Sequence, residues 1–139
     1  MKNKYEIIEH TADVGIRAWG STLAESFENA ARGMFAIITN NSKIDKIGEY
    51  KIVLNADDAE QLLVDWLSEL LFLNSAKNLV FGDFKVELSD NYKHLHAIVG
   101  GEKYNREKHG YGTEIKAITY HMLKVEKKPP YTVEVLFDI

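Results

Sequence analysis

Carboxylates near the two ends of the chain are the residues best suited to chemistry. Asp13 lies in the stretch HTADVG, residues 10–15, and Asp138 precedes the last residue, Ile139, whose main-chain carboxylate adds another negative charge. Three carboxylates are costly to bring together unless a cation or strong hydrogen-bond donors lie among them. Oxygen-only ligands favour a hard ion. We therefore expect Asp13, Asp138 and Ile139 to meet and to bind calcium or magnesium.

Each of these residues also has a structural interpretation. Aspartate is a favoured turn residue whose side chain can bond its own backbone, so Asp13 can serve as a turn cap. Asp138 can be a solvated chain end. His10 lies close to Asp13 in the sequence, where it can orient or neutralise the carboxylate or simply pack in the turn. The wide separation of Asp13 and Asp138 in sequence leaves both interpretations open.

Four other side chains could bind a ligand or a partner. His94 and His96 alternate on one face of a predicted strand, a spacing used in metal sites, but no cysteine or third clustered histidine accompanies them. His121 falls in an apolar stretch and is expected to be a core or edge histidine. Lys116 follows a glycine-rich segment, where it either reaches from the sheet to water or contacts a partner.

Two short runs of strand composition flank the HTADVG stretch. Residues 5–9 and 14–19 predict a β-hairpin with a polar tip. Thr22 and Glu25 then form a T-x-x-E capping box, typical of a helix start. Apolar residues at three- and four-residue spacing continue that helix to Ile38. The hairpin and this helix are expected to hold Asp13 in place.

The remaining pattern predicts one further helix and five further strands. Asp57 and Asp58 can cap the second helix, whose dense leucines indicate burial on more than one face. Residues 100–112 carry four glycines and no clear period, which indicates a long exposed loop. The other predicted elements are a strand at 50–55, a hairpin of 84–89 and 94–99, a long central strand at 115–125 and a strand at 131–137.

The resulting order is ββαβαββββ. It predicts an α+β fold, a two-layer sandwich of two helices on a mainly antiparallel sheet, within a single domain spanning residues 1–139.

Composition and charge exclude several classes of protein. The absence of cysteine excludes disulfides, thiolate zinc sites and a cysteine nucleophile. Neither a signal peptide nor an apolar run of about 18 residues is visible, so a soluble cytoplasmic protein with no membrane partner is expected. With 17 basic and 21 acidic residues, the net charge of −4 disfavours direct binding to the phosphate backbone of RNA or DNA.

Familiar catalytic motifs are also missing. The chain has no G-x-S-x-G elbow, no P-loop and no G-x-G-x-x-G after a strand. A stand-alone metal-dependent hydrolase remains an alternative, because a bound ion could activate water. His10 is the only local candidate for its general base.

Three separated blocks resemble the archease family. Residues 10–20 (HTADVGIRAWG), continuing into a helix, resemble the family signature H-T-A-D-x-x-x-x-x-[WG]-G. Residues 116–121 (KAITYH) and 136–139 (LFDI) resemble its later K-A-x-T-Y and terminal D-[IL] blocks. The blocks occur in the family order and span nearly the whole chain.

The resemblance implies a function that the residue pattern alone does not give. Archeases are accessory proteins of the GTP-dependent tRNA-splicing ligase of the RtcB type. They promote its guanylylation and multiple turnover and alter which nucleotide it accepts, and they are also credited with a chaperone role toward RNA-modifying enzymes. The protein would then not be an enzyme, and its contact with RNA would be indirect.

The resemblance also assigns roles to particular residues. The family's calcium-type site maps onto Asp13, Asp138 and Ile139, and its conserved lysine maps onto Lys116 as a contact to the ligase. His10, like Lys116, is a candidate for binding the partner.

Overall fold

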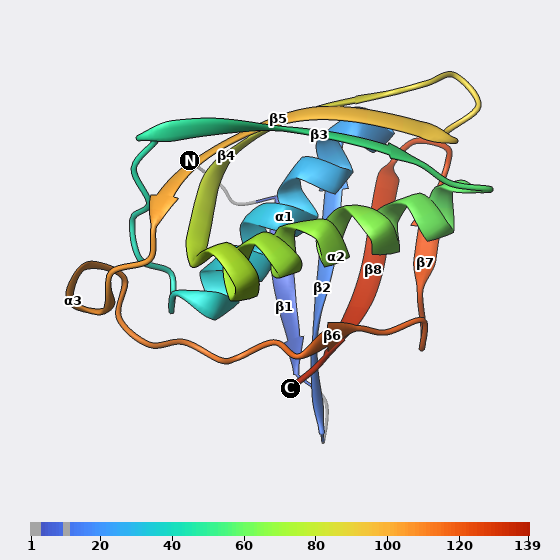
Figure 1. Ribbon diagram of the computed structural model, residues 1–139. Coiled ribbons are helices and arrows are strands. Elements are labelled where there is room, and N and C mark those ends of the chain that lie inside the picture. The colour runs from blue at the N-terminus through green and yellow to red at the C-terminus, as the bar shows by residue number, and fades with distance from the viewer. Residues whose placement is uncertain (1–3, 10–11) are drawn as a thin grey trace.

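The computed structural model describes residues 4–9 and 12–139 and shows an α+β fold with antiparallel sheets (Figure 1), which confirms the predicted class. Its elements are β1 (Tyr5–Glu9), β2 (Asp13–Gly20), α1 (Leu23–Ile38), β3 (Gly48–Asn55), α2 (Ala59–Lys77), β4 (Leu79–Leu88), β5 (His94–Lys103), α3 (Arg106–His109), β6 (Ala117–Ile118), β7 (Lys124–Glu126) and β8 (Tyr131–Asp138).

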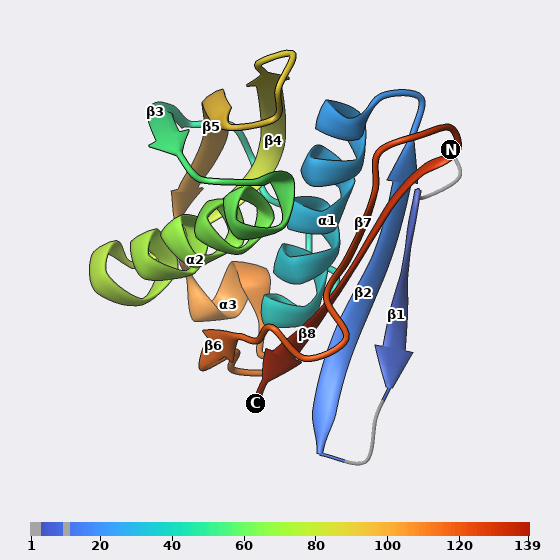
Figure 2. The same ribbon diagram turned by 90° about the vertical axis from the view of Figure 1, so that its right-hand side faces the viewer.

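The described strands are divided between two sheets, whereas the sequence predicted one. The first has the order β1-β2-β8-β6, with β7 also paired to β8, and the second has the order β3-β5-β4. Helix α1 lies between them and contacts both β2 and β4 (Figure 2). Both sheets therefore share one core, with α1 at its centre.

Local sequence explains where α1 begins and how closely it packs. The Thr22 side chain accepts a hydrogen bond from the Glu25 amide (3.0 Å), as the capping box predicts. The Glu25 carboxylate accepts from the Ser21 amide (3.2 Å) instead of from Thr22. A Cβ atom at Gly33 would lie 2.7 Å from the Ile16 side chain, so glycine allows α1 to approach the first sheet closely.

Helix α2 is the other main core element. Asp58 caps it by accepting from the Gln61 amide (2.8 Å), and Asn78 ends it in the left-handed conformation with φ 59°. The fully buried Trp66 donates from Nε1 to the Phe27 carbonyl oxygen of α1 (3.1 Å). The predicted multi-sided burial of α2 is confirmed, because eight of its residues are buried. Within the described residues, no helix is long and apolar enough to cross a membrane.

Antiparallel pairing of β2 with β8 sets which side chains face the core. The register runs from Asp13 opposite Asp138 to Gly20 opposite Tyr131. Alternate residues of both strands are buried toward α1, namely Val14, Ile16, Ala18, Val133, Val135 and Phe137. Because side chains alternate across a strand, Asp13 and Asp138 lie on the opposite, outer face.

Two predicted segments differ in the structure. The supposed loop at 100–112 begins inside β5, which extends to Lys103 because β3 and β4 pair with it on both sides. It then forms α3, and His109 is fully buried.

The predicted strand at 115–125 is also wrong. Within this run only β6 and β7 form strands, each paired with β8, and the residues between them leave the sheet in a turn where Met122 has φ 57°. His121 is exposed in this turn, so its prediction as a core or edge histidine is wrong too.

Candidate functional site

The structure brings Asp13 and Asp138 together. They are direct partners in the β2–β8 register. Directly opposed side chains in an antiparallel pair have Cβ atoms roughly 5 Å apart and share one face of the sheet. Asp13 is half-buried and Asp138 is exposed, so both carboxylates are within reach of solvent ions.

Lys116, which directly precedes strand β6, lies at the same end of the sheet. Ala117 pairs with Asp138 on the side opposite β2, and the Lys116 amide donates to the Asp138 carbonyl oxygen (2.7 Å). Ile139 follows directly and is 39% exposed. Figure 1 shows the C-terminus beside β6 and near the hairpin end of β2. We refer to Asp13, Lys116, Asp138 and Ile139 as the acidic pole.

The charges of Asp13 and Asp138 are not neutralised by an ion pair with any other described residue. Arg17 lies on the same face of the sheet, two cross-strand rows away from Asp13. It forms ion pairs with Glu134 (2.7 Å) and Glu6 (2.7 Å). The hydrogen bond and charge of Glu134, and those of Glu6, raise the pKa of Arg17 above its ordinary value. The sheet thus places a cation between carboxylates in one row and opposes two carboxylates directly in another, an arrangement that favours an added cation.

The donor set of the acidic pole fits a hard cation. Asp13 and Asp138 offer carboxylate oxygens, and the main-chain carboxylate of Ile139 is adjacent. Among the described residues, no group of three or more His, Asp or Glu side chains could hold a metal. An ion held here would consequently need the Ile139 carboxylate or water to complete its coordination.

The histidine candidates do not extend this site. His10 lies outside the described residues. His94 and His96 are exposed on β5 in the other sheet, where the Nδ1 of His94 is 2.6 Å from the Asn55 side-chain oxygen.

A cluster around Glu102 was missed by sequence reasoning. Glu102 accepts from the Asp45 amide (2.7 Å), from Lys108 Nζ (2.9 Å) and from His109 Nε2 (3.0 Å). Burial opposes ionisation of Glu102, but these three donors and the charge of Lys108 outweigh it and lower its pKa to about 2. His109 Nδ1 accepts from the Asn105 amide (2.8 Å), so both ring nitrogens are satisfied inside the protein. The cluster is therefore structural, and the run of charges in 100–112 gave no sign of it.

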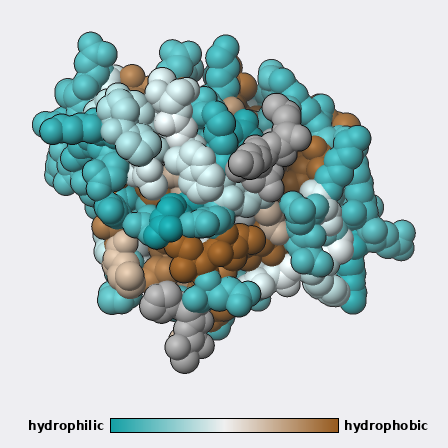
Figure 3. Space-filling model, turned by 180° about the vertical axis from the view of Figure 1, so that it is seen from behind, coloured by the Kyte–Doolittle hydropathy of each residue, from teal (hydrophilic) through white to brown (hydrophobic). Residues whose placement is uncertain are grey.

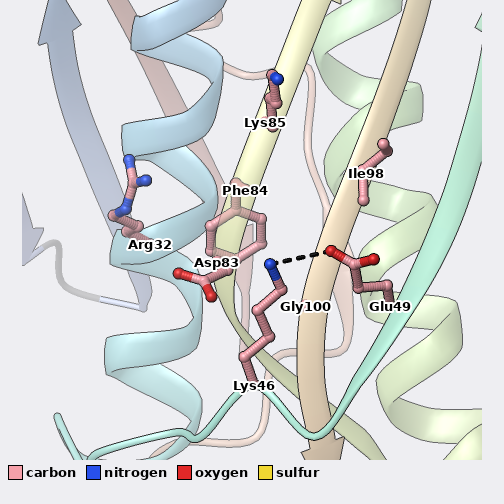
Figure 4. Close-up of a pocket in the computed structure, with 8 residues that line it drawn as sticks. All are labelled: Arg32, Lys46, Glu49, Asp83, Phe84, Lys85, Ile98 and Gly100. Carbon is pink, nitrogen blue, oxygen red and sulfur yellow. Dashed lines mark ion pairs between the residues drawn. The ribbon is translucent and has the colours of Figure 1, made fainter.

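A separate hollow lies on the second sheet (Figure 4). Its lining mixes cations and carboxylates: Arg32, Lys46, Glu49, Asp83, Phe84, Lys85, Ile98 and Gly100. Lys46 is paired with Glu49 (2.9 Å), and Asp83 lies between Arg32 and Lys46. Because carboxylates lie among the cations, this hollow is poorly suited to phosphate groups, which agrees with the missing phosphate-binding motifs.

The family model of the archease protein family matches residues 5–139. The chain belongs to this family. That match includes β2, β6 and β8, the three strands that place the acidic pole, and it confirms the resemblance found from the sequence.

Curated archeases align with this archease-family chain over most of its length. Protein archease of Methanosarcina mazei is 44% identical over 140 residues, covering 98% of this chain and 96% of that protein. Protein archease of Pyrococcus furiosus is 46% identical over 128 residues, covering 91% of this chain and 90% of that protein.

Two solved structures are similar to it. A solution structure of a Methanobacterium thermoautotrophicum protein has a TM-score of 0.80 and 32% identity, covering 99% of this chain and all of that one. A crystal structure from Thermotoga maritima, described as an archease and possible chaperone, has a TM-score of 0.63 and 25% identity, covering 96% of both chains.

Proposed function

We propose that this archease is an accessory activator of a GTP-dependent RNA ligase of the RtcB type, acting in tRNA splicing. It promotes guanylylation and multiple turnover of the ligase and alters which nucleotide the ligase accepts. The observation that supports this proposal is that Asp13 and Asp138 lie together, with Lys116 beside them, at one end of a chain that matches the archease family over residues 5–139.

The chemistry of the acidic pole suggests how it would act. Asp13, Asp138 and the Ile139 carboxylate would hold calcium or magnesium, which would supply a fixed positive charge at the contact with the ligase. Lys116 is exposed and hydrogen-bonded to Asp138 only through its backbone, so its ammonium group is available to a phosphate or carboxylate of the partner. The acidic pole would thereby position groups of the ligase, and the ligase itself would carry out nucleotide transfer.

Ligase guanylylation tests the proposal. GMP incorporation into purified ligase should rise in the presence of this protein and return toward the level of ligase alone with Asp13→Ala. A matched control is Asp90→Ala, which removes an exposed aspartate in the turn between β4 and β5. Equal stimulation by wild type and Asp13→Ala would overturn the role of the acidic pole.

A chaperone role is the second candidate, supported by the description of the Thermotoga protein as a possible chaperone. It predicts that the protein slows aggregation of an RNA-modifying enzyme on heating, independently of Asp13.

A stand-alone hydrolase is the third candidate function. Phosphoester turnover by the isolated protein with divalent ions, lost in Asp13→Asn, would favour the hydrolase over the activator.

A further inference from the structure

The β1–β2 hairpin extends past the end of α1, so part of its inner face has no helix against it (Figures 1 and 2). Helix α1 ends at Ile38. A hollow of about 470 Å³ lies at this point. Its lining comes from the hairpin, the end of α1 and two nearby loops, and includes Tyr5, Ile7, Glu9, Asn40, Asn41 and Thr113.

The hollow follows β1 along its length. Tyr5, Ile7 and Glu9 alternate along the strand and all three line it. Ile7 is 48% exposed even though it pairs with the fully buried Ile16. Along this strand the hollow thus has an apolar position at Ile7 and a carboxylate at Glu9, whereas the loop residues Asn40, Asn41 and Thr113 make the rest of its lining partly polar.

The backbone of β1 is available for pairing on one side. Among the described strands, only β2 pairs with β1. The Trp19 amide donates to the Lys4 carbonyl oxygen (3.0 Å), which fixes Lys4 as a residue whose polar groups face β2. Because these groups alternate in an antiparallel pair, the N–H and C=O of Tyr5, Ile7 and Glu9 face away from β2.

One edge of the second sheet, strand β4, is protected by a side chain. The Val86 amide of β4 donates to the Glu28 carboxylate of α1 (2.8 Å), so a side chain takes the place of a neighbouring strand. Edge strands without such protection readily pair with another extended segment. β1 contains neither proline nor lysine, the residues that commonly prevent such pairing.

We infer that β1 and its hollow bind an extended segment of a protein partner by strand addition. The backbone would pair with Tyr5, Ile7 and Glu9, an apolar side chain would enter the hollow over Ile7, and a lysine or arginine would meet Glu9. Backbone pairing supplies affinity in this mode, and alternate side chains supply specificity. The inference rests on the proposed function, because it assigns that segment to the ligase.

Charge supports this occupant over a second copy of the chain. β1 carries Glu6 and Glu9 and no basic residue, so pairing with another β1 would bring two acidic strands together. A ligase that binds RNA and GTP must present cations around its polyanionic substrates, which suits Glu9 and the nearby acidic pole.

Two measurements test the inference. First, amide hydrogen exchange of β1 should slow when purified ligase is added to the labelled protein, while exchange of β3, an edge strand of the other sheet, should not change. Second, Ile7→Arg should weaken ligase binding by roughly tenfold or more. The matched control Val53→Arg alters a 64% exposed residue of β3 and should bind like wild type. Circular dichroism and thermal melting would establish that both variants fold.

Backbone pairing is separated from side-chain contact by two further variants. Ile7→Ala removes only the apolar side chain, whereas Ile7→Pro also removes the outward N–H, so proline should weaken binding more than alanine. If the ligase binds this protein and is stimulated by it while amide exchange of β1 stays unchanged, the inference about the β1 edge is overturned and the proposed function stands. Absence of both binding and stimulation by wild type would overturn both. If amide exchange of β1 is slow at high protein concentration without ligase, a second copy of this chain pairs with β1, and the inference is overturned as well.

Discussion

A single cross-strand register determines the geometry of the acidic pole. Asp13 meets Asp138 because β2 and β8 pair antiparallel, and a slip of one residue would turn one carboxylate toward the core. Short-range periodicity does not tell which strands pair, so the local pattern could not give this register. The carboxylate chemistry led to the expectation that Asp13, Asp138 and Ile139 share a cation, and the family resemblance assigned them to one metal site. The structure places the two aspartates side by side.

Lys116 is expected to act on the ligase and not on the metal. Lys116→Ala should leave calcium affinity unchanged and reduce stimulation of ligase guanylylation, because its ammonium makes no ion pair with described carboxylates within the protein. Calorimetry and a guanylylation assay measure the two effects. Lys85→Ala, which removes an exposed lysine of the other sheet, is the control. Stimulation equal to wild type would remove Lys116 from the acidic pole.

Asp13→Asn should have different effects on the melting temperature with and without calcium. In EDTA, the variant should melt at the same temperature as wild type or slightly higher, since a repulsion between opposed carboxylates is removed. In calcium, wild type should gain about 2.7 kcal/mol at 100 times the dissociation constant, and the variant should gain much less. Thermal melting measures both. A loss of stability that is the same in EDTA and calcium would mean that Asp13 is only structural.

Segments between the regular elements are where sequence prediction failed. The helices α1 and α2 were predictable because their caps and apolar spacing are local. The run 115–125 looked like one strand because it is apolar on both faces, but pairing with β8 breaks it into β6 and β7. Burial of His109 was equally hidden, because its partner Glu102 looks like a surface residue in sequence.

Gly112 holds the segment that carries Lys116, just before β6, against the end of α1. Its amide donates to Ile38 O (3.1 Å), and the Thr113 amide donates to Ile37 O (2.9 Å). A Cβ at residue 112 would overlap the Ile37 carbonyl oxygen. Gly112→Ala should therefore lower the melting temperature and weaken ligase stimulation together. The matched change Gly48→Ala meets no atom closer than 3.8 Å, so it should leave the fold and the stimulation unchanged. A Gly112→Ala variant as stable and active as wild type would contradict this packing.

The Glu102 cluster should make stability depend on acid pH. The pKa of the Glu102 carboxyl is about 2 in the folded protein and near the ordinary 4.5 when the chain is unfolded. A lowered pKa means that the stabilisation is complete above pH 4.5 and is lost as the pH falls toward 2. Glu102→Gln should lower stability at pH 7 by about 1–3 kcal/mol and flatten the decline between these values. Denaturant unfolding at several pH values measures this. An unchanged pH slope would show that Glu102 is not the group responsible.

At the scale of the whole molecule, the two-sheet arrangement leaves one face of the first sheet open to the partner proposed above. Helix α1 fills the space between the sheets, and no helix of residues 4–9 and 12–139 covers the outer face of the first sheet (Figure 2). Figure 3, which views the molecule from behind, shows a hydrophobic band on this side, bordered by hydrophilic residues. By register, the row next to the acidic pair on this outer face contains Ile8, Gly15 and Leu136. The α+β class was predictable from the order of elements, whereas the division into two sheets depends on long-range pairing.

The central claim is that Asp13 and Asp138 bind one cation together, and calorimetric titration with calcium tests it most directly. Wild type, Asp13→Asn, Asp138→Asn and the double variant complete a thermodynamic cycle. We predict one calcium site in wild type, a large loss of affinity in each single variant, and little further loss in the double variant. Absence of calcium binding by wild type, or independent additive effects of the two substitutions, would contradict the account.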